Sequence, residues 1–252
     1  MSSKPADQSA PRVEKTIFAG QDAWIKRPEA ERSTFFSGLH RLLARALPKV
    51  LRPTNAVGGM AALTAEAARL RDFRSAGLPV PEVLEETSAH IVLADCGPTL
   101  RTHLRKTPDR NERLELIAAA QAVLVQVHHS GRAHGRPFLK DMTMGAGDTQ
   151  IHLLDLEEDP CAHMTLGDAQ ARDVWLFLMS CTEFHNDPQA GLQAQLMDLL
   201  EALPSGAKPH LIALGRGLRP FRRIIGATRT TSVSRDVAGA YWSTRALEDL
   251  AR

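Results

Sequence analysis

The chain has 252 residues, of which 43% are hydrophobic, a composition that suits one globular domain or a small two-lobed one. Its formal net charge of +2 implies no nucleic acid or other polyelectrolyte as a partner. The three cysteines form no C-x-x-C pair, which favours a reduced compartment and argues against a disulfide framework or a thiolate zinc site: Cys96, Cys161 and Cys181.

The two ends of the chain differ in character. Residues 1–12 are polar, carry two prolines and lack the apolar core of a signal peptide, so we expect a disordered tail there. The most apolar helical stretch, residues 114–127, is too short to span a bilayer, which predicts a soluble, cytoplasmic protein. Residues 209–252 are distinctly basic. This basic region is compatible with a peripheral contact with the anionic inner face of the membrane. Solvated charges on helices explain the basic residues equally well.

The first predicted element is a hairpin within residues 13–26. Two alternating runs, 15–18 and 23–26, flank a connection that contains glycine. The second run ends at Lys26, and a lone lysine in that position usually is a solvated charge at the edge of a sheet. Residues 29–53 then follow helical spacing with an arginine-rich face, so we interpret them as a helical insertion.

The next predicted elements are a helix and a strand. The helix covers residues 60–76, because Gly77 and the prolines beyond it are stop signals, and Glu66 flanks its apolar stripe. The strand covers residues 90–94 and runs into Asp95 and a Gly-Pro break. A hinge between two lobes and an ordinary strand end look alike in such a pattern.

Two helices, residues 99–105 and 111–130, precede the stretch that carries the chemistry, residues 134–160. In that stretch Asp141 lies in a loop and Asp155 ends an apolar, β-like run. Because a loop, a hairpin and a strand separate them, we expect the two acids to meet at one end of a sheet. A divalent cation with oxygen ligands can sit there beside a phosphate chain.

The remainder of the chain is predicted to be helical. A helix over residues 169–181 carries Asp173 among apolar residues, and a buried carboxylate without a partner is costly. Further helices are predicted over residues 187–203 and 209–217, and a basic, partly helical region follows them.

The order of these motifs resembles that of the protein kinases, and most of all the small bacterial kinases related to lipopolysaccharide-core kinases and RIO-type kinases. The matching segments, in chain order, are Trp24-Ile25-Lys26 for V-A-I-K, the phrase G-L-P-V-P after the first helix, His134-Gly135 with the offset to Asp141 for the catalytic loop, Asp155-Leu156-Glu157 for D-F-G, and Asp173-Val174-Trp175 for D-V-W.

This resemblance implies roles for the matching residues. Lys26 would hold the phosphates of ATP, Glu66 would orient that lysine, and Asp95 would lie at the hinge that binds the adenine edge. Asp155 and Asp141 would hold Mg²⁺. The resemblance further implies that His134 and Asp173 are structural, with Asp173 accepting hydrogen bonds from the backbone of the catalytic loop.

Two positions of the catalytic loop depart from the family pattern. Arg136 stands where the family has its catalytic Asp, and Asp141 stands where it has a metal-binding Asn. Arg136 cannot act as a base because its guanidinium stays protonated, and a missing general base typically costs about 10²–10⁴-fold in rate. Arg136 is able instead to fork onto a phosphate or carboxylate. No glycine-rich loop precedes Lys26.

We therefore expect an α+β, two-lobed, protein-kinase-like fold, with residues 13–97 as an N-terminal lobe of reduced sheet and residues 98–252 as a mainly helical C-terminal lobe. The favoured function is an ATP- and Mg²⁺-dependent phosphotransferase whose acceptor is a lipopolysaccharide sugar or protein Ser/Thr. Two alternatives stay open: a catalytically impaired pseudokinase that binds nucleotide as a regulator or scaffold, and a helical binding domain whose kinase motifs are accidental. The sequence fixes neither the acceptor nor the oligomeric state.

Overall fold

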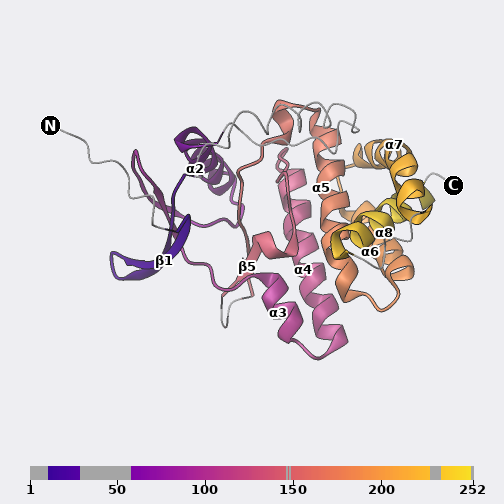
Figure 1. Ribbon diagram of the computed structural model, residues 1–252, viewed down its shortest axis with the longest axis horizontal. Coiled ribbons are helices and arrows are strands. Elements are labelled where there is room, and N and C mark those ends of the chain that lie inside the picture. Colours follow the sequence, from indigo (N-terminus) through magenta and orange to yellow (C-terminus); the bar gives the residue numbers. More distant parts are fainter. Residues whose placement is uncertain (1–10, 29–57, 146, 148, 228–233, 251–252) are drawn as a thin grey trace.

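The computed structural model describes residues 11–28, 58–145, 147, 149–227 and 234–250. It has a mixed α+β architecture, with a small N-terminal sheet, one helix beside the sheet, and a mostly helical remainder (Figure 1). The insertion predicted at residues 29–53 lies outside the described residues, as do residues 1–10 of the predicted tail.

The N-terminal sheet has four antiparallel strands in the order β1-β2-β4-β3. Their bounds are Val13–Phe18 for β1, Gln21–Lys26 for β2, Val83–Glu86 for β3 and Ile91–Ala94 for β4. β1 and β2 form the predicted hairpin, with each strand two residues longer than the alternating pattern indicates. Ala19 and Gly20 form the turn, and their φ values of 48° and 85° are of the kind that a type I′ turn requires, with positive φ at both positions.

Helix α2, Met60–Ser75, lies beside this sheet (Figure 1). Gly77 follows it at φ 75°, and the N–H of Leu78 donates to the carbonyl of Phe73, which closes the last turn. One face of the helix is buried, and the buried residues recur at helical spacing: Leu63, Glu66, Ala67, Leu70 and Phe73. A glutamate is therefore held within an apolar stripe.

The middle of the chain joins the sheet to the helical part. Its elements are α3 (Leu100–Lys106), α4 (Arg110–His129), the short 3₁₀ helix η2 (Leu139–Asp141), β5 (Met142–Met144) and β6 (Ile151–Leu153). Thr99 and Asp109 cap the two α-helices by accepting hydrogen bonds from backbone N–H groups of the first turn. β5 and β6 pair antiparallel, with Met142 opposite Leu153, so residues 141 and 154 flank the same end of this hairpin.

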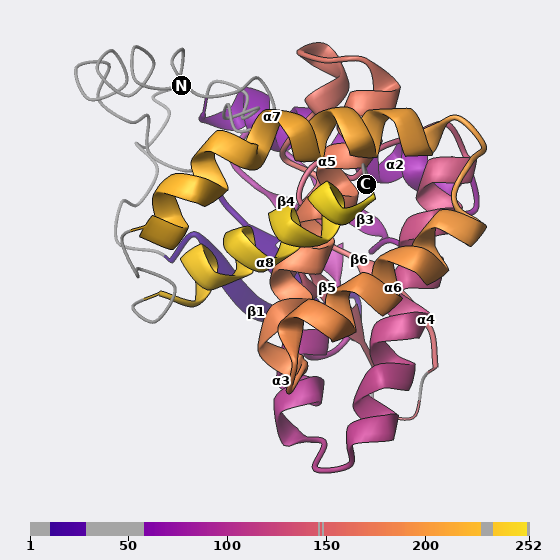
Figure 2. The same cartoon turned by 90° about the vertical axis from the view of Figure 1, so that its right-hand side faces the viewer.

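The helical remainder packs around α5. It consists of the short 3₁₀ helices η3 (Pro160–Ala162) and η4 (Thr182–Phe184) and of α5 (Leu166–Cys181), α6 (Pro188–Ala202), α7 (Ala207–Ala227) and α8 (Arg235–Asp249). α7 and α8 pack against each other and against α5, which joins the main hydrophobic core (Figure 2). Within the described residues, no helix has the length and apolar character needed to cross a membrane.

Helix α7 is longer than the sequence indicates, and the prediction of an end at residue 217 is wrong. The helix runs to Ala227 and contains Pro220. A Cβ at Gly215 would lie 2.9 Å from the backbone of Leu247, so this glycine allows α8 to pack closely on α7. Packing of the two helices outweighs the unfavourable local propensity of glycine and proline.

Candidate functional site

A cavity of about 390 Å³, here called the central cavity, lies between the N-terminal sheet and the β5–β6 hairpin. Its volume falls in the range of small-molecule sites. Apolar residues form much of its wall, among them Val13, Trp24, Leu70, Leu93 and Ala94. The charged residues that line it come from both sides: Arg12, Lys26, Glu66, Asp95, Asp141 and Asp155.

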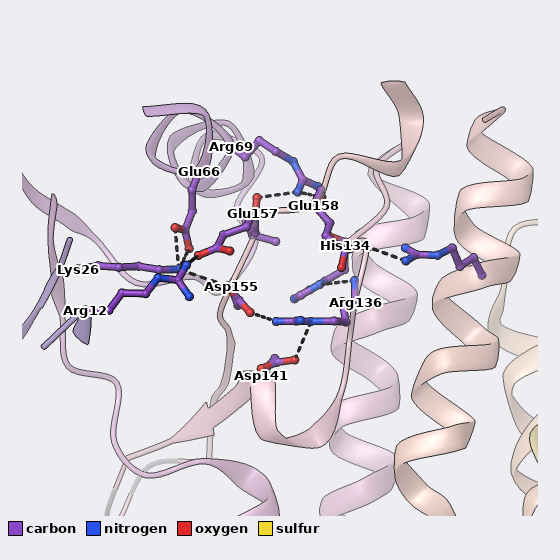
Figure 3. A network of polar contacts seen from close by, with 12 residues as sticks. Arg12, Lys26, Glu66, Arg69, His134, Arg136, Asp141, Asp155, Glu157 and Glu158 are labelled. Atoms are coloured by element: carbon purple, nitrogen blue, oxygen red, sulfur yellow. Dashed lines mark hydrogen bonds and ion pairs between the residues drawn. The ribbon is translucent and has the colours of Figure 1, made fainter. Parts of the chain in front are cut away.

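Lys26 lies in the middle of three carboxylates (Figure 3). Its Nζ is 2.8 Å from Glu66, 3.2 Å from Asp155 and 2.6 Å from Glu157, and Glu157 also contacts Arg12. Burial acts to lower the pKa of Lys26, but the three carboxylates together outweigh burial. The pKa is therefore raised above its ordinary value, and the ammonium stays charged. β2, α2 and the segment after β6 are thereby joined at one cation.

Asp141 and Asp155 meet because the backbone of the hairpin brings them together. The N–H of Leu154 donates to the carbonyl of Asp141 at 2.8 Å, directly beyond the last pair of the hairpin. Asp155 adopts φ 60°, in the left-handed region, which turns the chain sharply out of β6. The sequence pattern predicted this meeting of two acids at one end of a hairpin.

The guanidinium of Arg136 lies between these two carboxylates (Figure 3). Its Nε is 3.4 Å from Oδ2 of Asp141, and its Nη2 contacts Oδ2 of Asp155. Burial raises the pKa of Asp141 to about 6. Burial also acts to raise the pKa of Asp155, but Lys26 and Arg136 together hold it below its ordinary value.

The oxygen atoms of these acids are the ligand type that Mg²⁺ prefers, yet side-chain cations take the places beside them. Arg136 lies between Asp141 and Asp155, and Lys26 contacts all three of Glu66, Asp155 and Glu157, whose oxygens lie within 4.8 Å of one another. A guanidinium does not give up its charge at neutral pH. As the side chains stand, the site does not fit a metal ion shared by the two aspartates.

Asp173 of α5 holds the loop that carries Arg136. Its carboxylate accepts the backbone N–H of His134 at 2.6 Å and that of Gly135 at 2.8 Å, and it lies 3.3 Å from Nε2 of His128. His134 is fully buried, and burial lowers its pKa to about 4, so the ring is neutral. Its Nδ1 accepts the N–H of Arg136. Asp173 thus holds the backbone of the loop, and His134 contacts the N–H of Arg136 within it.

Sequence reasoning missed the residue that ties the loops together, Arg69 of α2. Its guanidinium donates to the carbonyls of Ala133, His134, Leu156 and Glu158. Figure 3 shows Arg69 beside Glu158. One arginine therefore binds both the segment before Arg136 and the segment after Asp155. The sequence did contain a sign of this role: Arg69 follows Glu66 by three residues and so lies on the same face of α2 as Glu66.

A second missed group is the buried pair of Arg172 and Glu158, whose side chains lie 2.8 Å apart. Arg172 also contacts the carbonyl of Gly135, next to the loop that Asp173 holds. A Cβ at Gly135, which has φ 104°, would lie 2.7 Å from the carbonyl of Glu158, so the two segments touch at the backbone. Together these contacts fix the spacing between Arg136 and Asp155.

Asp95 lies at the edge of the central cavity, after β4. Its carboxylate accepts the N–H of Gly97 at 2.8 Å and lies 2.9 Å from Nζ of Lys15, while its own N–H donates to the carbonyl of Asp22. These contacts fix the short connection between the N-terminal sheet and α3. The carboxylate has a structural task there, whatever the cavity binds.

No protein-family model matches the chain, and no curated protein matches it. One solved structure that is similar carries the description "Structure of vaccinia related kinase 3", with 15% sequence identity and a TM-score of 0.30. The match covers 56% of this chain and 41% of that one, so the chain spans less than half the length of that structure. A likeness at this level assigns neither a family nor a function.

Proposed function

We propose that this chain is a protein-kinase-like, nucleotide-binding protein in which phosphoryl transfer is impaired, and that it acts as a regulator or scaffold. The observation that carries the proposal is the continuous line of contacts from Glu66 through Lys26 and Asp155 to Arg136 beside the central cavity. The first part of this line favours binding of a nucleotide, and its last member opposes turnover.

Lys26 favours the binding of phosphates. It lines the cavity, and Glu66 of α2 holds its ammonium in place. A cation whose position is already fixed costs little further ordering when a ligand arrives. The apolar wall that Trp24, Leu93 and Ala94 provide suits the flat face of a nucleobase.

Arg136 opposes the transfer step. It stands at the position of the general base in the family that the chain resembles, and a guanidinium cannot accept a proton. Loss of a general base costs about 10²–10⁴-fold in rate. Arg136 also contacts Asp141 and Asp155, and it thereby neutralises the carboxylates that a divalent cation would need as ligands.

An ATP- and Mg²⁺-dependent phosphotransferase is the second candidate. It is favoured by the fact that Asp141 and Asp155 line the same cavity as Lys26, which gathers oxygen ligands and a phosphate-binding cation. The acceptor would then be an alcohol group of a lipopolysaccharide sugar or of a protein Ser/Thr. This candidate requires Arg136 to leave the two aspartates.

Calorimetric titration with ATP and ADP, each with Mg²⁺ and with EDTA, tests the binding proposal. Lys26→Met should weaken affinity at least about tenfold, because a hydrogen bond to a charged group contributes about 1.5–3 kcal/mol. Asp155→Asn removes one of the carboxylates that contact Lys26, retains Glu66, and is the reference for the transfer assay described next. Lys208→Met removes the same charge from an exposed position on α7, and its affinity should equal that of the wild type.

Transfer of labelled phosphate separates the two candidates. An impaired protein transfers no more phosphate than Asp155→Asn does, whereas a phosphotransferase transfers phosphate and loses this activity in that variant. Failure of the wild type to bind either nucleotide under both conditions refutes both candidates.

A further inference from the structure

A second cavity, of about 420 Å³, lies in the helical part of the molecule and is here called the basic pocket. Four segments that are distant in sequence form it: α3, the loop with η2, the end of α5 with η4, and the start of α8. A Cβ at Gly239 of α8 would lie 2.7 Å from the carbonyl of Met179, so α8 packs closely on α5 and the wall is fixed. No residue that lines this pocket also lines the central cavity.

Three arginines converge on the carboxylate of Glu183: Arg101 and Arg235, which line the basic pocket, and Arg105, which lies outside its lining. Arg101 lies 2.6 Å from its Oε1, while Arg105 and Arg235 lie 3.0 and 3.3 Å from its Oε2. Burial acts to raise the pKa of Glu183, but the hydrogen bonds from Arg101 and Arg105 outweigh burial. The pKa lies below its ordinary value, and the carboxylate is ionised. Glu183 therefore gathers three guanidinium groups but neutralises only one of their positive charges.

The charges do not balance in this pocket. The lining holds three cations, Arg101, Lys140 and Arg235, against the carboxylates of Glu183 and Asp236, which leaves an excess of one positive charge. Arg105 contacts Glu183 from outside the lining and raises the excess of this cluster to two. Each guanidinium carries five N–H donors in a planar fork, far more than two carboxylate oxygens can accept. Such forks match the oxygens of a phosphate.

The floor of the pocket is apolar. Phe138, Leu139, Met179 and Ala238 line it, and Nζ of Lys140 lies 5.6 Å from the centre of the Phe138 ring. A cation over an aromatic face is attracted to it, which holds the ammonium near the pocket. The ligand that fits has a charged group for the arginines and a compact, uncharged part for the floor.

We propose that the basic pocket binds a phosphate monoester of a small molecule. A phosphate monoester carries a charge of about −1.5 to −2 at pH 7, which matches the excess of the cluster that includes Arg105, whereas a single carboxylate supplies half of it. Phe138 and Lys140 line this pocket and Asp141 lines the central cavity, so one loop separates the two sites. A bound phosphate would therefore contact the loop that presents Asp141 to the nucleotide.

Titration of the full chain with glucose 6-phosphate, followed by calorimetry and by NMR shifts of the amides of Ser180 and Ala238, tests this proposal. We expect glucose to produce no shift, and gluconate, which carries a carboxylate on a similar frame, to bind at least about tenfold more weakly. Arg101→Gln should weaken binding of glucose 6-phosphate about tenfold, and the double variant with Arg235→Gln should weaken it further. Arg216→Gln, at an exposed position on α7, should change nothing.

Two further measurements ask whether the phosphate group belongs to a lipid, and whether binding to this pocket is independent of the nucleotide site. Vesicles of phosphatidylcholine with phosphatidic acid test a lipid headgroup, and tighter binding to these than to glucose 6-phosphate assigns the site to a lipid phosphate. Lys26→Met should leave sugar phosphate binding unchanged, which separates this pocket from the nucleotide site. The proposal is overturned if no phosphate probe binds, or if Arg216→Gln weakens binding as much as Arg101→Gln does.

Discussion

Arg136 and Asp155 are in direct contact, guanidinium to carboxylate, at the point where the chain leaves β6. The same guanidinium lies 3.4 Å from Asp141. The two acids that the sequence brings together thus share a cation that belongs to the chain itself. This relationship distinguishes the site from one that is open to a metal ion.

Replacement of Arg136 should open the acid pair to metal ions. Arg136→Asn removes the positive charge and leaves an amide oxygen near two carboxylates, a ligand set that suits a hard cation. We expect the affinity for Mn²⁺, measured by electron paramagnetic resonance, to rise at least about tenfold, which corresponds to about 1.4 kcal/mol.

Two control variants accompany this measurement. Arg223→Asn, at an exposed position on α7, should leave Mn²⁺ affinity unchanged, and Asp155→Asn in the Arg136→Asn background should remove the gain. Tight binding of Mn²⁺ by the wild type, with no increase in Arg136→Asn, would contradict the role given to the guanidinium.

Loss of the Asp173 carboxylate should destabilise the fold strongly. Asp173→Ala leaves the buried N–H groups of His134 and Gly135 without their acceptor. Breaking a buried charged network typically costs about 3–5 kcal/mol. Urea unfolding should show a loss of this size, while Asp198→Ala, on the exposed side of α6, should stay within about 0.5 kcal/mol of the wild type. Equal losses in the two variants would show that Asp173 does not hold the loop.

Arg69 should be irreplaceable by lysine. A lysine carries a single ammonium and cannot reach the carbonyls of two separate segments, as the guanidinium fork of Arg69 does. In Arg69→Lys we expect faster amide hydrogen exchange in residues 133–136 and 156–158, and a loss of about 1–3 kcal/mol in unfolding free energy. Arg71→Lys, which changes an exposed arginine two residues further along α2, is the matched control. Unchanged exchange in Arg69→Lys would contradict the clamp.

Asp141 should make stability depend on pH between about 4 and 6. Its pKa is raised to about 6 in the folded chain, above the ordinary value of about 3.9 in the unfolded chain. The unfolded state therefore releases this proton first as pH rises, and the contribution of Asp141 to stability falls over that range.

The effect of Asp141 is isolated by comparison with Asp141→Asn, because the buried His134, with its pKa lowered to about 4, gives a dependence of opposite sign. Relative to this variant, the unfolding free energy of the wild type should fall by about 1–3 kcal/mol between pH 4 and pH 7. Parallel stability curves for the two proteins would contradict the raised pKa.

A clash at the backbone should be visible at Gly135. Gly135→Ala, at φ 104°, places a Cβ 2.7 Å from the carbonyl of Glu158, whereas Gly131→Ala, at φ 72°, meets nothing within 4 Å. Both substitutions strain the backbone, more so at Gly135, and only Gly135→Ala adds a close contact between the two segments. We expect Gly135→Ala to be less stable by at least about 1 kcal/mol in urea unfolding. Equal stabilities would argue against close contact there.

Local pattern was sufficient for those parts of the site that lie on single elements. Hydrophobic periodicity and glycine stop signals located α2 with Glu66, the hairpin ending at Lys26, and α5 with Asp173. The pairing of β5 with β6 placed Asp141 and Asp155 at one end of a hairpin. These features depend on residues close in sequence, and short-range backbone geometry decides them.

The tertiary structure alone decided which charges meet. Arg69 binds two loops, Glu157 contacts Lys26, and Arg136 rather than open space lies between the two aspartates. The basic pocket likewise unites Arg101 and Arg235 across the helical part of the chain. Long charged side chains have many rotamers and reach several neighbours, so their partners depend on how helices and loops pack. No local pattern in the sequence encodes that packing.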